Sequence, residues 1–183
     1  FTCDRGFQVL FDAYPAVREE LDLDALDLRA FSPGGIICRP GQRSTLSDPF
    51  RDPTTLVESA LNREVTLGDK LRTLRLRRRL TSEDWPEFGI PDRSIRAFLR
   101  DEGFSQGFID AFAAPLYGGI TLDRSLATSA HVFEYTFRAM SKGRICVPAA
   151  GMAAIPEQLA ERAREAGVEL RTGEAVEAID TSG

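Results

Sequence analysis

The sequence predicts an α+β fold in which a helical cap lies beside a small antiparallel sheet, flanked by partial strands and one further helix. Residues 28–46 contain two strand-like runs around Pro40-Gly41, a pair typical of a type II turn. Helix signals dominate residues 66–142, and the longest is an apolar stripe at helical spacing. Near the end, a helix pattern stops at Gly167 and passes directly into strand-like runs, as in half of a βαβ crossover.

Short elements come first along the chain. Residues 6–10 are apolar and partly β-branched, which favours the end of a strand. Pro15 opens a short helix that we expect to end near Leu21, because proline is tolerated in a first helical turn. The predicted hairpin follows. Beyond it, Pro53 opens a further helix that we expect to reach about Asn62.

Helix-start and helix-stop residues divide the middle of the chain into short helices. Thr66 and Asp69 resemble a capping box, with Asp in place of the usual Glu, and predict a helix to about residue 80. A second helix is predicted over residues 92–102, before a glycine, and Ser105 caps the next. The apolar stripe predicts a helix of about four turns with one buried face. Its members are Leu126, Ala130, Phe133, Phe137 and Met140.

The clearest helix pattern lies near the C-terminal end. Pro156 is expected at a first helical position, with acidic and basic residues in the first and last turns and Gly167 just beyond. Residues 168–171 and 175–180 then predict two strands around Thr172-Gly173. We expect the strands that would pair with them to lie outside this sequence.

Composition and charge exclude several classes of partner. A chain of 183 residues that is 43% hydrophobic can bury a core without disulfides or metals. Its 28 acidic and 23 basic residues give a net charge of −5, which disfavours broad attraction to nucleic acid or anionic lipid. The longest apolar stretch, residues 145–155, is too short to span a membrane. We therefore expect a small-molecule substrate or a protein partner.

The cysteines indicate neither a disulfide framework nor a metal site. Cys3, Cys38 and Cys146 are far apart and match no metal-ligand spacing. We expect reduced thiols in a cytoplasmic protein. The chain carries no positively charged leader and opens on Phe1 rather than Met, so we expect the true N-terminus to lie upstream.

No motif names a catalytic group, so the catalytic residues stay unassigned. The chain has no glycine-rich phosphate motif and alone predicts no dinucleotide-binding fold. His131 adjoins the apolar stripe without a placed nucleophile or acid, and we assign it no catalytic role. Turn and cap duty explains the aspartates that adjoin prolines or lie at helix starts: Asp48, Asp52 and Asp69.

Two groups of side chains have two interpretations each. An arginine run can contact a phosphate or form a solvated face that pairs with carboxylates, which the acidic overall charge favours. An aromatic group can line an apolar substrate cavity or pack in the core. Gly118-Gly119 marks a close backbone approach or a sharp turn. The first group is Arg72, Arg75, Arg77, Arg78 and Arg79, and the second is Phe108, Phe112, Tyr117, Phe133, Tyr135 and Phe137.

Several segments resemble, in order, landmarks of the FAD-dependent oxidoreductase superfamily that contains phytoene desaturases, flavin amine oxidases and protoporphyrinogen oxidases. Residues 167–179 resemble its returning strand pair. Ala150 departs from the pattern, where the family usually has a second glycine, and the N-terminal GxGxxG and the C-terminal flavin-binding segment are absent. The other landmarks are residues 4–10, Gly68-Asp69-Lys70, residues 112–120 and residues 148–156.

The resemblance implies an internal piece of an enzyme that oxidises a C–H of an apolar or amine substrate by hydride transfer to FAD. Residues 28–142 would be the substrate-binding domain, and residues 1–27 and 143–183 would be partial edges of a Rossmann-like FAD domain. Cofactor contacts would come from Gly6, Phe7, Gln8 and Val176, and substrate contacts from Phe112, Tyr117, Gly118, Phe133 and Phe137.

For this chain by itself we expect no bound FAD and no activity, and FAD only in the full-length parent. We expect no nucleic-acid partner, no membrane span and no metal, while exposed strand edges offer a route to a homodimer. An amine, a carotenoid-like polyene and a porphyrinogen all stay open as substrates, as does the electron acceptor. The alternative from another class is a non-catalytic helical protein-interaction module.

Overall fold

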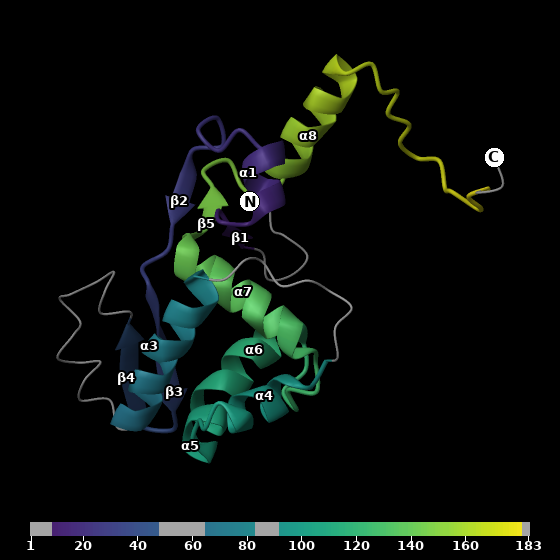
Figure 1. Ribbon diagram of the computed structural model, residues 1–183. Coiled ribbons are helices and arrows are strands. Elements are labelled where there is room, and N and C mark those ends of the chain that lie inside the picture. The colour runs from purple at the N-terminus through teal and green to yellow at the C-terminus, as the bar shows by residue number, and fades with distance from the viewer. Residues whose placement is uncertain (1–8, 48–64, 83–91, 181–183) are drawn as a thin grey trace.

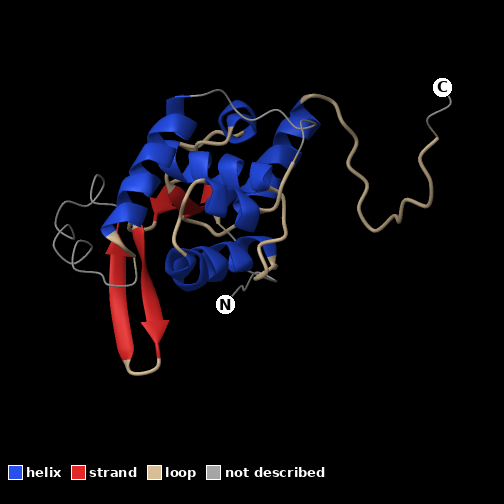
Figure 2. Ribbon diagram, turned by 60° about the horizontal axis from the view of Figure 1, so that its bottom comes forward, coloured by secondary structure: helices blue, strands red, loops and turns tan. Residues whose placement is uncertain are grey.

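The computed structural model describes residues 9–47, 65–82 and 92–180. It combines helices with two small antiparallel sheets, which confirms the predicted α+β class (Figure 1). A helical body holds the core, a two-stranded hairpin projects away from it, and a helix near the C-terminus extends as an arm (Figures 1 and 2). The predicted helix at residues 53–62 lies outside the described residues.

The three-stranded sheet has the order β1-β5-β2 and joins parts of the chain far apart in sequence. Strand β5 (Ile145–Pro148) lies between β1 (Leu10–Phe11) and β2 (Leu28–Ala30). Both pairings are antiparallel, with Cys146 opposite Leu10. We did not predict β5, because its four residues merge with the apolar stretch that continues to residue 155. Cys146 and Cys38 are free thiols, as predicted, and Cys3 lies outside the described residues.

The predicted hairpin is confirmed. Strands β3 (Gly34–Arg39) and β4 (Gln42–Ser47) pair in antiparallel register, with Ile36 opposite Thr45. Gly41 has a φ of 72°, the positive value that the third position of a type II turn requires and that glycine adopts without strain. The short helix α1 (Pro15–Glu20) is also confirmed, with Tyr14 and Leu21 as its caps.

The helical body consists of α3 (Leu67–Ser82), α4 (Ile95–Asp101), α5 (Gln106–Phe108), α6 (Ala114–Thr121) and α7 (Ala130–Lys142). A π-helical turn, η2 (Ile109–Ala113), makes α5 and α6 continuous. The predicted caps are present, since the Ser105 hydroxyl accepts from the Phe108 amide and Gly103 ends α4 with a φ of 80°. Leu126 lies outside α7 in a loop, with a φ of 58°, so the helix begins four residues after the first residue of the predicted stripe.

For the region around Gly118 we expected a close backbone approach or a sharp turn, and only the first is present. Residues 114–121 form helix α6, so the sharp turn we proposed there is wrong. The close approach is confirmed, because a Cβ on Gly118 would lie 2.8 Å from Arg124 Cγ and 3.1 Å from Arg124 Cα. Gly119 has nothing within 4 Å of its Cβ position. Gly118 is therefore required by packing rather than by backbone conformation.

Helix α7 runs through the core of the body. Phe133 lies 5.4 Å from Phe98 of α4 and 4.6 Å from Tyr117 of α6, measured between ring centroids. The buried cluster around these rings draws on α3 to α7, so one apolar core holds all the helices of the body together. The other buried members include Leu76, Leu80, Ile95, Leu99, Phe104, Phe108, Ile109 and Leu126.

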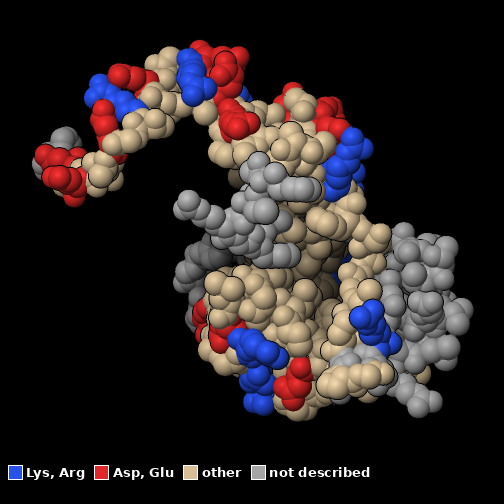
Figure 3. Space-filling view, turned by 180° about the vertical axis from the view of Figure 1, so that it is seen from behind, with Lys and Arg blue, Asp and Glu red and all other residues tan. Residues whose placement is uncertain are grey.

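Helix α8 (Ala154–Glu165) forms the arm and starts two residues before Pro156. It is held to the region after α1 by Gln158, whose side-chain oxygen accepts from the Asp22 amide at 2.9 Å and whose amide donates to the Asp22 carbonyl at 3.1 Å. Seen from behind, the arm carries acidic and basic side chains next to one another (Figure 3). Its apolar side has no buried residue.

The chain after α8 corrects the prediction of a returning strand pair. Residues 168–180 form no strand and are exposed throughout. Val168 and Leu170 have the β-propensity that we used, but isolated strands are not stable in water without partners. Among the described residues, none supplies a ladder for this segment. Local composition therefore predicted a state that only tertiary pairing can stabilise.

Candidate functional site

Three of the five predicted substrate residues form one stack of rings between α6 and α7. Tyr117 is 1% exposed and Phe133 is 4% exposed, and Phe137 stacks on Phe133 with ring centroids 5.4 Å apart. Phe137 is only partly buried and packs against the core cluster from its edge. The structure thus brings Tyr117, Phe133 and Phe137 together, with Phe137 as the member nearest the surface.

The other two predicted residues lie apart from this stack. Phe112 is partly buried and reaches Phe108, with centroids 5.2 Å apart, on the π-helical turn before α6. Gly118 is buried against Arg124, where it allows the chain after α6 to approach the helix. Phe112 has no ring contact with Phe133 of α7 among the described pairs. Two surface depressions lie beside α1.

Two tyrosines extend the aromatic surface from α7 to β1. Tyr14 stacks on Tyr135 with centroids 5.0 Å apart, and Phe11 meets Tyr14 edge-on at 5.3 Å. Burial, and next the neighbouring Tyr135, raise the pKa of Tyr14 to about 12. We had grouped Tyr135 with the aromatic residues but had not predicted Tyr14, because no local pattern indicates a contact across more than a hundred residues. Its neutral hydroxyl is a hydrogen-bonding group rather than a base at neutral pH.

The buried Tyr117 hydroxyl has a polar neighbour. It lies 3.4 Å from Thr136 Oγ1, which donates to the Val132 carbonyl one turn earlier in α7 at 2.7 Å. Burial raises the pKa of Tyr117 well above its ordinary value. The buried Tyr117 hydroxyl is therefore uncharged at neutral pH, and its surroundings suit apolar contact rather than acid–base chemistry.

A buried carboxylate ties the sheet to the end of α7. Asp12 Oδ1 accepts from the Arg144 amide at 2.5 Å, and Asp12 Oδ2 accepts from Arg144 Nε at 2.8 Å. Gly143 permits this approach, because a Cβ there would lie 2.5 Å from Ala13 Cβ. Asp12 thereby fixes β1 and Tyr14 relative to α7. Sequence reasoning missed it, although it lies only two residues after the predicted strand end.

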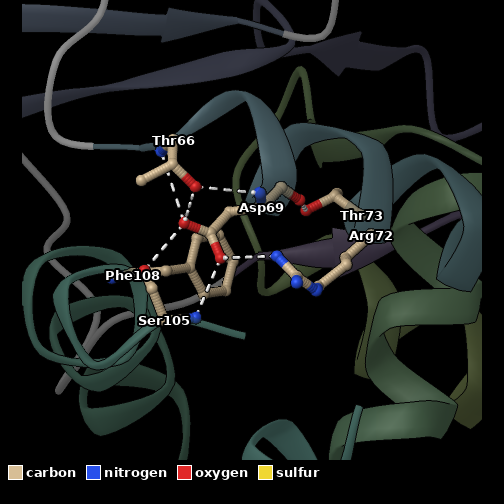
Figure 4. Close-up of polar contacts among 6 residues, drawn as sticks. All are labelled: Thr66, Asp69, Arg72, Thr73, Ser105 and Phe108. Atoms are coloured by element: carbon tan, nitrogen blue, oxygen red, sulfur yellow. Dashed lines mark hydrogen bonds and ion pairs between the residues drawn. The ribbon is translucent and has the colours of Figure 1, made fainter. Parts of the chain in front are cut away.

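A second buried carboxylate, Asp69, joins α3 to α5 (Figure 4). Its Oδ2 accepts from Thr66 Oγ1 at 2.5 Å and from Ser105 Oγ at 2.7 Å, and its Oδ1 accepts from the Ser105 amide at 2.9 Å. The Thr66 hydroxyl accepts in return from the Asp69 amide at 3.1 Å, which confirms the capping box. The carboxylate is fully buried, and Arg72 Nη1 lies 3.7 Å away. Asp48 and Asp52, the other predicted cap or turn residues, lie outside the described residues.

The balance of forces on Asp69 favours its charged form. Burial raises its pKa, but hydrogen bonds from Ser105 and Thr66 together more than offset that effect, so the pKa lies below its ordinary value. A carboxylate that accepts this many bonds holds two helix starts in a fixed relation. The role is structural, as the sequence analysis expected for this residue.

His131 is the one buried side chain whose polar atoms lack a hydrogen bond among the described residues. Its Nε2 lies 3.7 Å from Asp92 Oδ1 and its Nδ1 lies 3.6 Å from Glu134 Oε2, which are ion-pair distances when the ring is protonated. It lies in the first turn of α7, where its backbone amide donates to Ser129 Oγ at 3.1 Å. The prediction that it has no catalytic role stays a prediction.

A comparison with protein families shows which family the chain belongs to. The sequence model of the family described as flavin containing amine oxidoreductase matches residues 1–183. The chain belongs to this family. No curated protein and no solved structure gave a match. Membership in the flavin-containing amine oxidoreductases supports the resemblance at the level of the superfamily and identifies the chemistry of the family as flavin-dependent oxidation and reduction.

The predicted cofactor contacts of this flavin-containing amine oxidoreductase lie either outside the described residues or at an exposed position. Gly6, Phe7 and Gln8, the predicted contacts near the flavin ring, lie outside the described residues. Val176 is 79% exposed in the segment after α8. No group of three or more metal-ligating side chains is present in the described residues either. No described helix is long and apolar enough to cross a membrane.

Proposed function

We propose that this chain forms the substrate-binding region of an FAD-dependent oxidoreductase that oxidises a C–H of an apolar or amine substrate. Family membership supplies the flavin chemistry, in which the substrate gives a hydride to FAD. Residues 28–142 would be the substrate domain, and residues 1–27 and 143–183 would belong to the cofactor domain. Gly6, Phe7, Gln8 and Val176 remain the proposed cofactor contacts.

The observation that carries the proposal is the uncharged aromatic surface around α7. Tyr117 and Phe133 are fully buried, so their role is to hold the position of their neighbours. Phe137 and Phe112 keep exposed surface and are the rings that can touch a substrate. Tyr14 and Tyr135 add a stacked pair at the same helix. An oxidoreductase that places a C–H against flavin needs such a water-poor wall.

Amine, polyene and porphyrinogen substrates would each use this wall differently. A cationic amine would gain from the faces of Tyr14, Tyr135 and Phe137, because aromatic faces attract cations. A polyene or a porphyrinogen would use the same rings for apolar contact alone. The proposed location for the protein is cytoplasmic, with a small molecule as its substrate.

Substitution of the rings to alanine in the flavin-loaded full-length enzyme tests the proposal. Phe137→Ala should lower kcat/KM by at least about tenfold while costing well under the ~3–5 kcal/mol typical of a buried ring. Tyr117→Ala should show that full stability loss, because it leaves a cavity in the core. Phe104→Ala, a buried ring stacked on Phe108 away from α7, is the matched control for stability alone.

Turnover per folded molecule separates the outcomes. If Phe137→Ala unfolds as easily as Phe104→Ala and its turnover is unchanged, these rings are plain core and the substrate binds elsewhere.

A further inference from the structure

Helix α3 carries two apolar stripes on opposite sides, and only one of them is packed. Leu76 and Leu80 point into the core together with the buried Asp69. Leu67, Leu71 and Leu74 recur at spacings of four and three residues on the opposite side, so they form one continuous stripe. They are 71%, 67% and 38% exposed. One apolar stripe is enough to pack a helix against the helical body. The exposed leucine stripe of α3 therefore requires another explanation.

The same helix gathers positive charge in an acidic chain. Between residues 67 and 82 there are six basic residues and one acidic residue, whereas the whole chain has a net charge of −5. The single acidic residue is Asp69, whose carboxylate is buried beneath the helix and already bonded to Thr66 and Ser105. The outer surface of α3 is therefore basic without local compensation from its own residues.

The arginines of α3 divide into paired and unpaired groups. Arg79 pairs with Glu102 at 2.6 Å, and Arg72 lies beside Asp69 and along Gly103. Arg75 and Arg78 are exposed and make no side-chain hydrogen bond or ion pair with any described residue. Arg78 follows Leu74 by one turn on the leucine stripe, and Arg75 lies next to it. The unpaired charges thus stand at the stripe itself.

We propose that this face of α3 binds the surface of an anionic lipid bilayer. The leucines would enter the boundary between headgroups and acyl chains, and Arg75 and Arg78 would reach the lipid phosphates by extending along the surface. Surface binding needs no membrane-spanning helix. The inference stands on α3 alone and does not depend on the identity of the substrate.

An anionic bilayer can contact both the leucines and the arginines of this face, whereas other anionic partners would contact only the arginines. A nucleic acid would use the arginines but leave the three leucines in water. The acidic charge elsewhere on the chain does not prevent binding, because exposed charges more than about 8 Å apart are largely screened at physiological salt. The global charge that disfavoured lipid in the sequence analysis is therefore a poor guide to this local face.

Co-sedimentation of the protein with vesicles tests the proposal. One set of vesicles is phosphatidylcholine alone, and the other is an equal mixture of phosphatidylcholine and phosphatidylglycerol. Wild type should bind the mixed vesicles, less so as salt rises, and bind the neutral ones weakly. The double variants Leu67→Gln/Leu71→Gln and Arg75→Gln/Arg78→Gln should each weaken binding by about tenfold or more.

Arg164→Gln/Arg171→Gln is the matched control, because it makes the same change in net charge at exposed positions outside α3. It should bind like wild type. Thermal unfolding of each variant shows that the exposed substitutions leave the fold intact. Absence of binding to the mixed vesicles, or equal loss in the control, would overturn the proposal. Binding that the arginine variant loses and the leucine variant keeps, together with retention on heparin, would identify a polyanion surface instead.

Discussion

Asp69 places a full negative charge inside the protein. Because its pKa is shifted, its contribution to the free energy of unfolding should depend on pH. Its folded pKa is depressed, so its contribution is complete above the pKa of the unfolded chain, about 3.9 for aspartate. The contribution is lost as pH falls through the folded value. Protonation removes acceptor capacity from the Asp69 carboxylate, to which the Thr66 and Ser105 hydroxyls donate.

We expect Asp69→Asn to lower the free energy of unfolding by about 2 kcal/mol at pH 7, the scale of buried hydrogen bonds to a charged group. The gap between variant and wild type should shrink as pH falls below about 4, because wild type then loses the same charge. Urea unfolding across that pH range measures it. Asp110→Asn, at an exposed aspartate in the same body, serves as the control and should change little. A pH-independent gap would contradict the role of the charge.

Single residues were predictable where the chemistry is local. Thr66, Asp69 and Ser105 cap helices through bonds that span three residues, so sequence spacing contains the whole interaction. The bond from Ser105 to Asp69 spans 36 residues and was not predictable, and neither was the bond from Arg144 to Asp12 across 132. Each of these depends on how elements meet, which no local pattern encodes.

At the scale of elements, two adjacent glycines of α6 can be compared directly, because they differ in their neighbours. Gly118 faces the Arg124 backbone, whereas Gly119 faces open space. Gly119→Ala should raise the free energy of unfolding by roughly 0.5 kcal/mol, because alanine is favoured over glycine in a helix. Gly118→Ala should lower it by about 1–3 kcal/mol, because the added methyl group overpacks the contact.

Chemical denaturation of the two single variants measures the difference, and the opposite signs make each variant the control of the other. Destabilisation by both would mean that the helix tolerates no alanine here and that the close approach of Arg124 is not the cause.

The structure matches the predicted elements where the turn residues and the hydrophobic periodicity indicated the same element. Pro40-Gly41 and the flanking runs gave the hairpin, and the stripe from Ala130 to Met140 gave α7. Strand β5 was missed because a central strand of four apolar residues has no period to read. The strand pair at residues 168–180 was wrong because propensity alone cannot supply a partner. Both errors concern sheets, whose pairing is nonlocal.

At the scale of the whole molecule, the apolar core of the described residues lies around α7, and α1 and α8 lie outside it. The core cluster lies within residues 65–133, and Asp12 with Arg144 links β1 to it through α7. Helix α8 is held by polar contacts to residues 20–22 and has no buried residue of its own. The helical body that holds this core is the part of the chain that we propose binds the substrate.

This division predicts how the chain treats the cofactor of its family. FAD binding in a Rossmann-like domain depends on a glycine-rich loop that brings backbone amides to the pyrophosphate at a helix N-terminus. The sequence contains no such loop, and Val176 stands exposed without neighbours that could enclose an adenine. We therefore expect the 183-residue chain to fold around its helical body and yet be purified without colour.

Gel filtration after incubation with excess FAD, followed by the visible spectrum of the protein peak, measures how much FAD the chain retains. A flavin-containing amine oxidoreductase that carries the glycine-rich loop, handled identically, is the control and should keep its flavin. Stoichiometric flavin absorbance that stays with the 183-residue chain would show that its own residues build a cofactor site and would overturn the assignment of its ends as partial.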